Sequence, residues 1–190
     1  AKGWKGRVTF EELSSRFLLL DELRIRPEIA LVATTGEGHA IHIQTEKGHG
    51  WYKVMDGKIH YRWDSLEPLS LNLPSNHTEK FLELTPDEAL KLTWNSHYPD
   101  VFEQLTQLFK SPRTGDIVLS ANTGFDLREK YEHPEHKGSH GAICPEHMRT
   151  PLLMNYPIKK EFIRSVDIFP TVLELMGKKV PEGIDGKSLL

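Results

Sequence analysis

The chain has 190 residues, a formal net charge of −3, 38% hydrophobic and 27% charged residues. A chain of this length buries roughly two-thirds of its unfolded surface, so we expect a packed core. Lys and Arg are scattered and usually stand beside Asp or Glu, which excludes a strongly basic face for nucleic acid. No apolar run approaches the roughly 18 residues of a membrane span, and the N-terminus has no signal-peptide pattern. We expect a soluble protein, with the cytoplasm slightly favoured.

The first 63 residues predict a helix followed by an antiparallel meander. Thr9 and Glu12 form a capping box in front of apolar residues at helical spacing, which predicts a helix through "FEELSSRFLLLDEL". Four short segments then follow between residues 29 and 63, separated by the glycine-containing turns "TGEG", "KGHG" and "DGK". We expect this meander to be separate from the main sheet.

Two helices are predicted after an irregular connection, "DSLEPLSLNLPSN". Thr85 is the N-cap of the first, with Pro86 at the first helical position and Glu88 at the third. The second runs through "YPDVFEQLTQLFKSP" and ends before Pro112.

The last part of the chain predicts two buried strands and a final helix. "GDIVLSAN" and "TPLLMN" are short apolar runs of the kind found in a sheet covered on both faces. "SVDIFPTVLELMG" predicts a helix with Pro170 early and Gly177 as its stop.

A histidine-rich loop lies between the two predicted strands. His133, His136 and His140 are spaced by three and four residues, as zinc-binding imidazoles on one helix face would be. Pro134 and Gly138 argue against a helix, and a solvated loop has the same composition. A three-histidine zinc site and a surface loop therefore both remain open.

Cys144 and His147 follow the loop and could extend a ligand set. "CPEH" lacks the paired-cysteine spacing of a structural zinc site, and a small buried residue is the ordinary role for Cys144. As the single cysteine of the chain, it cannot form an internal disulfide.

The context of His140 is distinctive, because small residues flank it in "GSHG". This string is followed in order by "PLLM", "VDIFPTVLELMG" and "GIDGKSLL". The order resembles the C-terminal part of the alkaline phosphatase superfamily. It is most similar to the type I phosphodiesterase and nucleotide pyrophosphatase branch, with sulfatases and cofactor-independent phosphoglycerate mutases as more distant relatives. The resemblance covers about residues 115 to 190 and is weak before them.

The resemblance implies a three-layer α/β fold with two divalent metal ions, usually zinc. In the family, a Ser or Thr nucleophile attacks a phosphate or sulfate ester at the metals. The histidine of "GSHG" is a metal ligand there, and this role carries over to His140 alone; His133 and His136 match no family ligand. The family's other ligands include an Asp-His-Gly motif, which this sequence lacks. The most similar segment is "TGEGH", which ends at His39 and has the composition of an ordinary hairpin turn.

We therefore expect residues 1–112 to be an insertion or lid region and residues 113–190 to be the C-terminal part of a catalytic domain. The chain would need the upstream half of a longer polypeptide and would be inactive alone. The alternative is a stand-alone, non-catalytic binding or assembly module. An upstream reading frame that encodes a strand ending in Asp, a Ser or Thr nucleophile and Asp-His-Gly would favour the hydrolase.

Other candidates have simpler interpretations. Ser139 cannot pair with the adjacent His140 as nucleophile and base. Asp126 and Glu129 form a charged turn more readily than an acid–base pair. Asp167 is expected to cap the last helix. The four tryptophans are too scattered for a stacking platform: Trp4, Trp51, Trp63 and Trp94.

Overall fold

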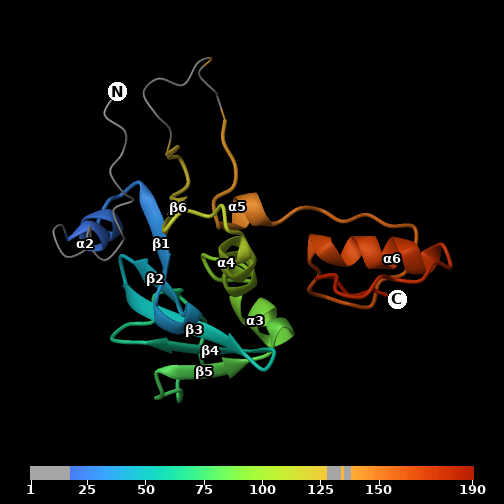
Figure 1. Ribbon diagram of the computed structural model, residues 1–190, viewed down its shortest axis with the longest axis horizontal. Coiled ribbons are helices and arrows are strands. Elements are labelled where there is room, and N and C mark those ends of the chain that lie inside the picture. The colour runs from blue at the N-terminus through green and yellow to red at the C-terminus, as the bar shows by residue number, and fades with distance from the viewer. Residues whose placement is uncertain (1–17, 128–133, 135–137) are drawn as a thin grey trace. The chain divides into compact units, whose positions relative to one another are not determined.

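The computed structural model describes residues 18–127, 134 and 138–190. The chain divides into two compact units, residues 1–149 and residues 150–190. Figure 1 shows the course of the chain through its elements. The sequence-based boundary between residues 112 and 113 falls inside the first unit, and the insertion role of residues 1–112 stays a prediction.

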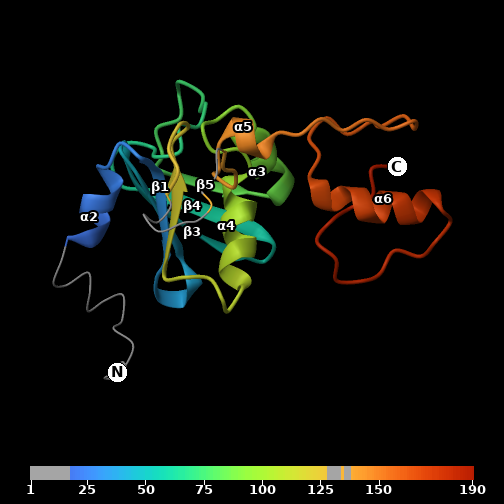
Figure 2. The same cartoon turned by 90° about the horizontal axis from the view of Figure 1, so that it is seen from above.

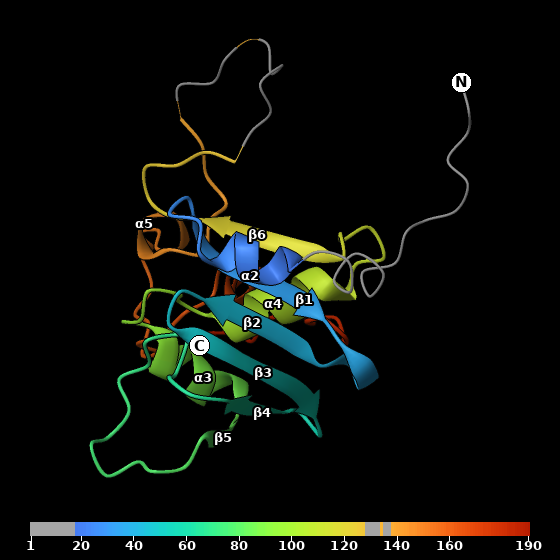
Figure 3. The ribbon, with the colours of Figure 1, turned by 90° about the vertical axis from the view of Figure 1, so that its left-hand side faces the viewer.

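The first unit is built on one open sheet of six antiparallel strands, so the protein is of mixed α/β class. The spatial order β5-β4-β3-β2-β1-β6 can be followed in Figure 3. The strands are β1 (Ile29–Thr35), β2 (Ile41–Thr45), β3 (Gly48–Met55), β4 (Lys58–Trp63), β5 (Phe81–Leu84) and β6 (Ile117–Ala121). The predicted antiparallel meander over residues 29–63 is confirmed as β1 to β4.

The strand period of two gives the sheet a core face and an outer face. Tyr52 of β3 is paired with Tyr61 of β4, and both side chains are fully buried on the core face. Phe102 meets both tyrosine rings edge-on, with centroids 5.1 and 5.0 Å away. The Tyr52 hydroxyl donates to the Phe102 carbonyl oxygen at 2.8 Å. The core therefore centres on three aromatic rings from two strands and one helix.

Two helices cover the core face. α3 (Pro86–Thr93) begins at the predicted capping box: the Thr85 hydroxyl accepts from the Glu88 N–H, and the Glu88 carboxylate accepts from the Thr85 N–H. α4 (Val101–Lys110) buries Phe102 and Leu105 against the sheet and ends before Pro112, as predicted. In Figure 2, α4 and the short helix α2 (Leu19–Arg24) lie on opposite sides of the sheet. α2 overlaps the C-terminal end of the predicted first helix, whose capping residues Thr9 and Glu12 are outside the described residues.

One strand prediction was confirmed in part and another was wrong. "GDIVLSAN" contains the strand β6, as predicted, but β6 pairs antiparallel with β1 and continues the meander instead of belonging to a separate main sheet. Leu119 of β6 is 37% exposed, so the strand is not covered on both faces as predicted. "TPLLMN" forms no strand, and Leu153 within it is 93% exposed. A short apolar run between prolines is compatible with an extended connection, since proline supplies no N–H to a sheet. The three-layer fold therefore remains a prediction.

The second unit is organised by a buried carboxylate. Its helix α6 (Ile168–Leu175) includes Pro170 and is followed by Gly177 at φ 63°, as predicted. Asp167, only 4% exposed, accepts from the Lys187 N–H at 2.9 Å, the Arg164 N–H at 3.2 Å and the Lys160 ammonium at 3.1 Å. Burial acts to raise the pKa of Asp167, but these hydrogen bonds outweigh it and hold the pKa below its ordinary value. Asp167 thus starts the last helix and ties the C-terminal segment to it.

None of the helices among the described residues is long and apolar enough to cross a membrane.

We predict that Phe102→Ala lowers the free energy of unfolding of the first unit by about 3–5 kcal/mol, because it empties the space between two buried tyrosine rings. Urea unfolding followed by tryptophan fluorescence measures this loss. Leu108→Ala on the same helix is the control: its side chain is 42% exposed, and the change should cost less than about 1 kcal/mol. A loss below that value for Phe102→Ala would contradict the assigned core.

Candidate functional site

The predicted ligand His140 lies on the loop that follows β6 and is exposed. Its side chain lines a cavity of about 460 Å³, together with Ser139 and His147 from the same loop region and Asn122 and Thr123 from the end of β6. The other two histidines of the loop, His133 and His136, are outside the described residues, so the three-histidine site is not tested by the structure.

The "GSHGAI" loop is attached to its surroundings by two hydrogen bonds. The Ile143 N–H donates to the Ser120 hydroxyl at 2.9 Å, in a buried position next to the sheet edge. The Ala142 N–H donates to His147 Nδ1 at 3.2 Å. Gly141 has φ 101°, a conformation that favours glycine, which explains the small residue after His140. The loop that presents His140 is therefore held by β6 on one side and by α5 (Pro145–Met148) on the other.

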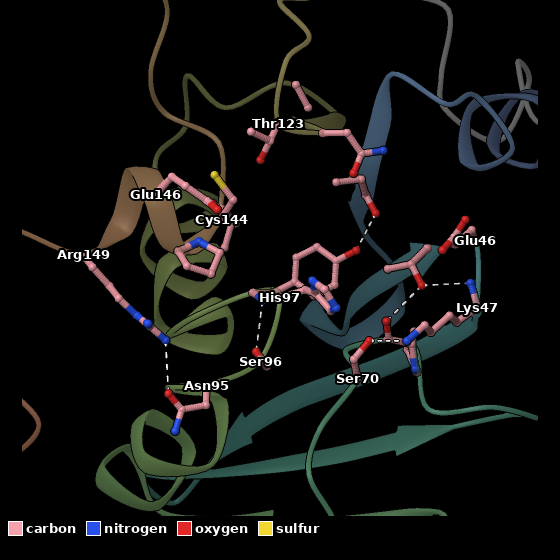
Figure 4. Close-up of a pocket in the computed structure, with 18 residues that line it drawn as sticks. Glu46, Lys47, Ser70, Asn95, Ser96, His97, Thr123, Cys144, Glu146 and Arg149 are labelled. Atoms are coloured by element: carbon pink, nitrogen blue, oxygen red, sulfur yellow. Dashed lines mark hydrogen bonds between the residues drawn. The ribbon is translucent and has the colours of Figure 1, made fainter.

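A second cavity of about 530 Å³ adjoins the first and shares Ala121, Asn122 and Thr123 with it. Figure 4 shows Lys47 and Ser70 at one side, Arg149 and Asn95 at the other, and His97 between them. The wall is mostly polar. The end of β6 therefore borders both cavities.

Two cations stand at the wall of this second cavity. The Lys47 ammonium donates to the Ser70 hydroxyl at 2.7 Å. The Arg149 guanidinium donates to the Trp94 carbonyl oxygen and lies 5.5 Å from the centroid of the Trp94 ring. Glu46 and Glu146 also line the cavity, so its charge is mixed rather than wholly positive. Such a wall suits a polar ligand that has both an anionic group and hydrogen-bond donors.

Tyr98 lines the second cavity with a phenol that is fixed by a hydrogen bond. The Tyr98 hydroxyl donates to the Ala30 carbonyl oxygen at 2.8 Å, and burial raises the pKa of Tyr98 to about 12. The phenol therefore stays protonated at neutral pH, and its hydrogen bond links the connection between α3 and α4 to β1. Cys144 also lines the cavity and is buried, as the sequence suggested for a small interior residue.

Among the residues with described positions, no three His, Cys, Asp or Glu side chains lie close enough to hold one metal ion. Asp126 and His147 line the same cavity as His140 and carry ligand-type atoms. His147 uses its Nδ1 for the Ala142 N–H, so only its Nε2 faces other partners. The structure thus brings His140 and His147 to one cavity without forming a closed ligand set from them.

The other sequence candidates have separate places. Ser139 is exposed beside His140, Asp126 lies at the cavity wall, and Glu129 is outside the described residues. Asp167 belongs to the second unit and occupies the N-cap position of α6, as predicted, but its side chain makes no capping hydrogen bond to that helix. Its carboxylate accepts instead from the Arg164 and Lys187 N–H groups. His39 has φ 59° in the turn that joins β1 to β2, which confirms a hairpin turn.

Sequence reasoning missed one group of side chains on the outer face of the sheet. His49 contacts the Asp64 carboxylate at 2.8 Å through Nδ1 and His42 at 3.0 Å through Nε2. His42 and His49 are seven residues apart, on two strands joined by one short turn. Their side chains project from the same face of the sheet. The seven-residue spacing could have predicted their contact, because a hairpin with a two-residue turn brings such residues to diagonal positions.

Comparison with family models, curated proteins and solved structures found no match for this chain.

We predict that Ser120→Ala loosens the His140 loop, because it leaves the buried Ile143 N–H without its acceptor at a cost of about 1–3 kcal/mol. Hydrogen exchange of the Ile143 amide should be at least about fivefold faster, as measured by NMR on the 190-residue chain. Ser111→Ala removes a comparable serine hydroxyl that serves only the exposed Arg113 N–H, and it should leave Ile143 unchanged. Equal exchange in the two variants would show that Ser120 does not hold the loop.

Proposed function

We propose that this chain is the C-terminal portion of a metal-dependent hydrolase of phosphate esters, including phosphodiesters and nucleotide pyrophosphates, or of sulfate esters. In this proposal His140 is a metal ligand. The observation that carries it is the ordered series "GSHG", "PLLM", "VDIFPTVLELMG" and "GIDGKSLL", which resembles the type I phosphodiesterase branch of the alkaline phosphatase superfamily.

The position of His140 supports this role. Its imidazole is exposed at a cavity wall, where a metal held partly by other residues can reach it. The flanking loop is attached by the Ser120 and His147 hydrogen bonds, which limits the positions that His140 can take. A ligand needs such support, because outer partners that orient a ligand typically contribute 10- to 100-fold in metal affinity or activity.

The chemistry requires more ligands than His140. Two divalent ions, zinc in this proposal, would stabilise the charge that develops on the attacking and leaving oxygens of an in-line displacement. The nucleophile and the remaining ligands would come from the upstream half of the polypeptide. The residues of this chain would contribute one imidazole and the polar wall around it.

The second cavity supplies a place for the ester itself. Lys47 and Arg149 can pair with an anionic oxygen, and the hydroxyl and amide groups between them can bind the rest of a polar substrate. Because this cavity shares the end of β6 with the His140 cavity, a bound ester would lie beside the proposed metal. The proposed substrate is a small-molecule phosphate or sulfate ester.

One observation favours the alternative, a non-catalytic binding or assembly module. The first unit has an aromatic core made wholly from its own strands and helices, so it does not need an upstream half to bury Tyr52, Tyr61 and Phe102. In that alternative the same polar cavity would bind a ligand without turnover.

We predict that His140→Ala, in the complete polypeptide, lowers hydrolysis by at least about 100-fold, since it removes a direct metal ligand. His133→Ala and His136→Ala are the matched controls from the same loop and should change activity less than about threefold. Steady-state hydrolysis at saturating zinc, with bound metal counted on each variant, measures this. Normal activity and metal content in His140→Ala, with both lost in a control, would make the loop itself the site.

We also predict that the 190-residue chain alone binds zinc only weakly and hydrolyses no aryl phosphate, phosphodiester or sulfate. A single imidazole cannot hold the two ions that the displacement needs. Zinc titration by calorimetry, with turnover assays before and after addition of a chelator, checks both points. Chelator-sensitive turnover by the isolated chain would refute the incomplete site, and tight stoichiometric zinc would revive the three-histidine loop.

A further inference from the structure

A chain of hydrogen bonds crosses the outer face of the sheet, away from both cavities. It joins Asp64 at the end of β4 to His49 of β3 and then to His42 of β2, and we call these three residues the relay. The register explains why they meet: His49 pairs with Gln44 and Trp51 pairs with His42, so His42 and His49 are diagonal neighbours. Trp51 stacks beside both imidazoles, at centroid distances of 6.5 and 5.5 Å.

The two imidazoles face each other head-on. The His42 Nδ1 to His49 Nε2 distance is 3.0 Å, the ring planes differ by 9°, and the centroids are 5.3 Å apart. The centroid distance exceeds the nitrogen distance by about two ring radii, which requires the two nitrogens to lie nearly on the line between the rings. Two imidazoles that bind one metal at an angle would bring their centroids closer together for the same nitrogen separation. The geometry is that of a shared proton.

The order of the hydrogen bonds fixes where the protons are. An ionised Asp64 can only accept, so His49 donates from Nδ1, and while the His49 ring is neutral its Nε2 carries no proton. His42 must then donate from Nδ1. The relay in its neutral form therefore has one nitrogen without a proton at its far end, His42 Nε2, and an added proton has to enter there.

The turn between β1 and β2 covers that end. A Cβ placed on Gly36 would come within 2.5 Å of His42 Nε2, so the turn backbone lies directly against the bare nitrogen. The turn continues through Gly38 and His39, both at positive φ, and a Cβ on Gly38 would come within 2.9 Å of the Lys53 ammonium. A proton on Nε2 would therefore point at the turn backbone and place its charge near the Lys53 ammonium.

We propose that the relay is a proton-sensing device, in which proton uptake at His42 Nε2 displaces the turn at residues 36–39. The charged groups around His42 are His49 and Lys53 on β3, Asp64 at the end of β4, Glu37 and His39 in the turn, and Asp21, Glu22 and Arg24 on α2, which packs on β1 and β2. Proton uptake places a positive charge on His42, near the Lys53 ammonium and next to the turn. The Asp64 carboxylate, linked through His49, is the group of the relay that stabilises this charge.

The direction of the pH dependence follows from burial. Desolvation, and then the charge of His49, lower the pKa of His42 from its ordinary value. The unfolded chain therefore takes up this proton at a higher pH than the folded chain does, and the stability of the first unit falls as the pH falls below about 6.5. The turn is expected to move at a midpoint below that value.

NMR on the 190-residue chain tests this proposal. At pH 7.5, both His42 and His49 should carry their proton on Nδ1, and the amide signals of residues 36–40 should titrate with the same midpoint as His42. Asp64→Asn should move that midpoint about 0.5 pH unit lower, since it removes the carboxylate that favours the cation. Gly36→Ala should displace the turn already at pH 7.5.

His49→Phe and His60→Phe form the matched pair of variants. His49→Phe keeps a ring beside Trp51 but breaks the relay, so the midpoint should rise toward about 6.5, whereas His60→Phe, on the same face and outside the relay, should not move it. If His49→Phe does not fold, the midpoint of His42 in Asp64→Asn tests the proposal instead. A proton found on His42 Nε2 at pH 7.5, turn amides that do not follow His42, or a midpoint unchanged in the relay variants would overturn the proposal.

Discussion

The antiparallel register of β2, β3 and β4 is the constraint on which the rest of the first unit depends. It places Tyr52 opposite Tyr61 on one face, where Phe102 of α4 closes the core. Because side chains alternate, the same register turns His42, His49 and Trp51 to the other face. A slip of one residue would expose the aromatic core and bury the histidines, so the core energy also holds the relay in place.

The proposed metal ligand depends on the same sheet at its edge. β6 pairs with β1, and its Ser120 hydroxyl accepts from Ile143 beyond the His140 loop. This link makes the exposed loop a defined extension of the sheet. The end of β6 also borders both cavities, which share Ala121, Asn122 and Thr123.

Local patterns in the sequence predicted the local structure well. The Thr85 capping box, the helix before Pro112, the hairpin turn at His39 and the stop at Gly177 all depend on neighbouring residues, and all are confirmed. The failures involve long-range partners. An apolar run such as "GDIVLSAN" carries no information about which strand it will pair with, and it joined β1 rather than a separate sheet. Asp64 and His49 are 15 residues apart and meet only through the β3–β4 register, which single-residue arguments did not use.

The candidate site was predicted in part. "GSHG" singled out His140, and the structure places it at a cavity wall, but Lys47, His97 and Arg149 of the adjoining cavity had no sequence signal because they come from three separate loops. The metal role of His140 is the central claim. Anomalous diffraction at the zinc edge, on crystals of the complete polypeptide, tests it most directly. We predict a zinc peak about 2.0–2.1 Å from a ring nitrogen of His140. Zinc bound by His133 and His136, with none at His140, would contradict it.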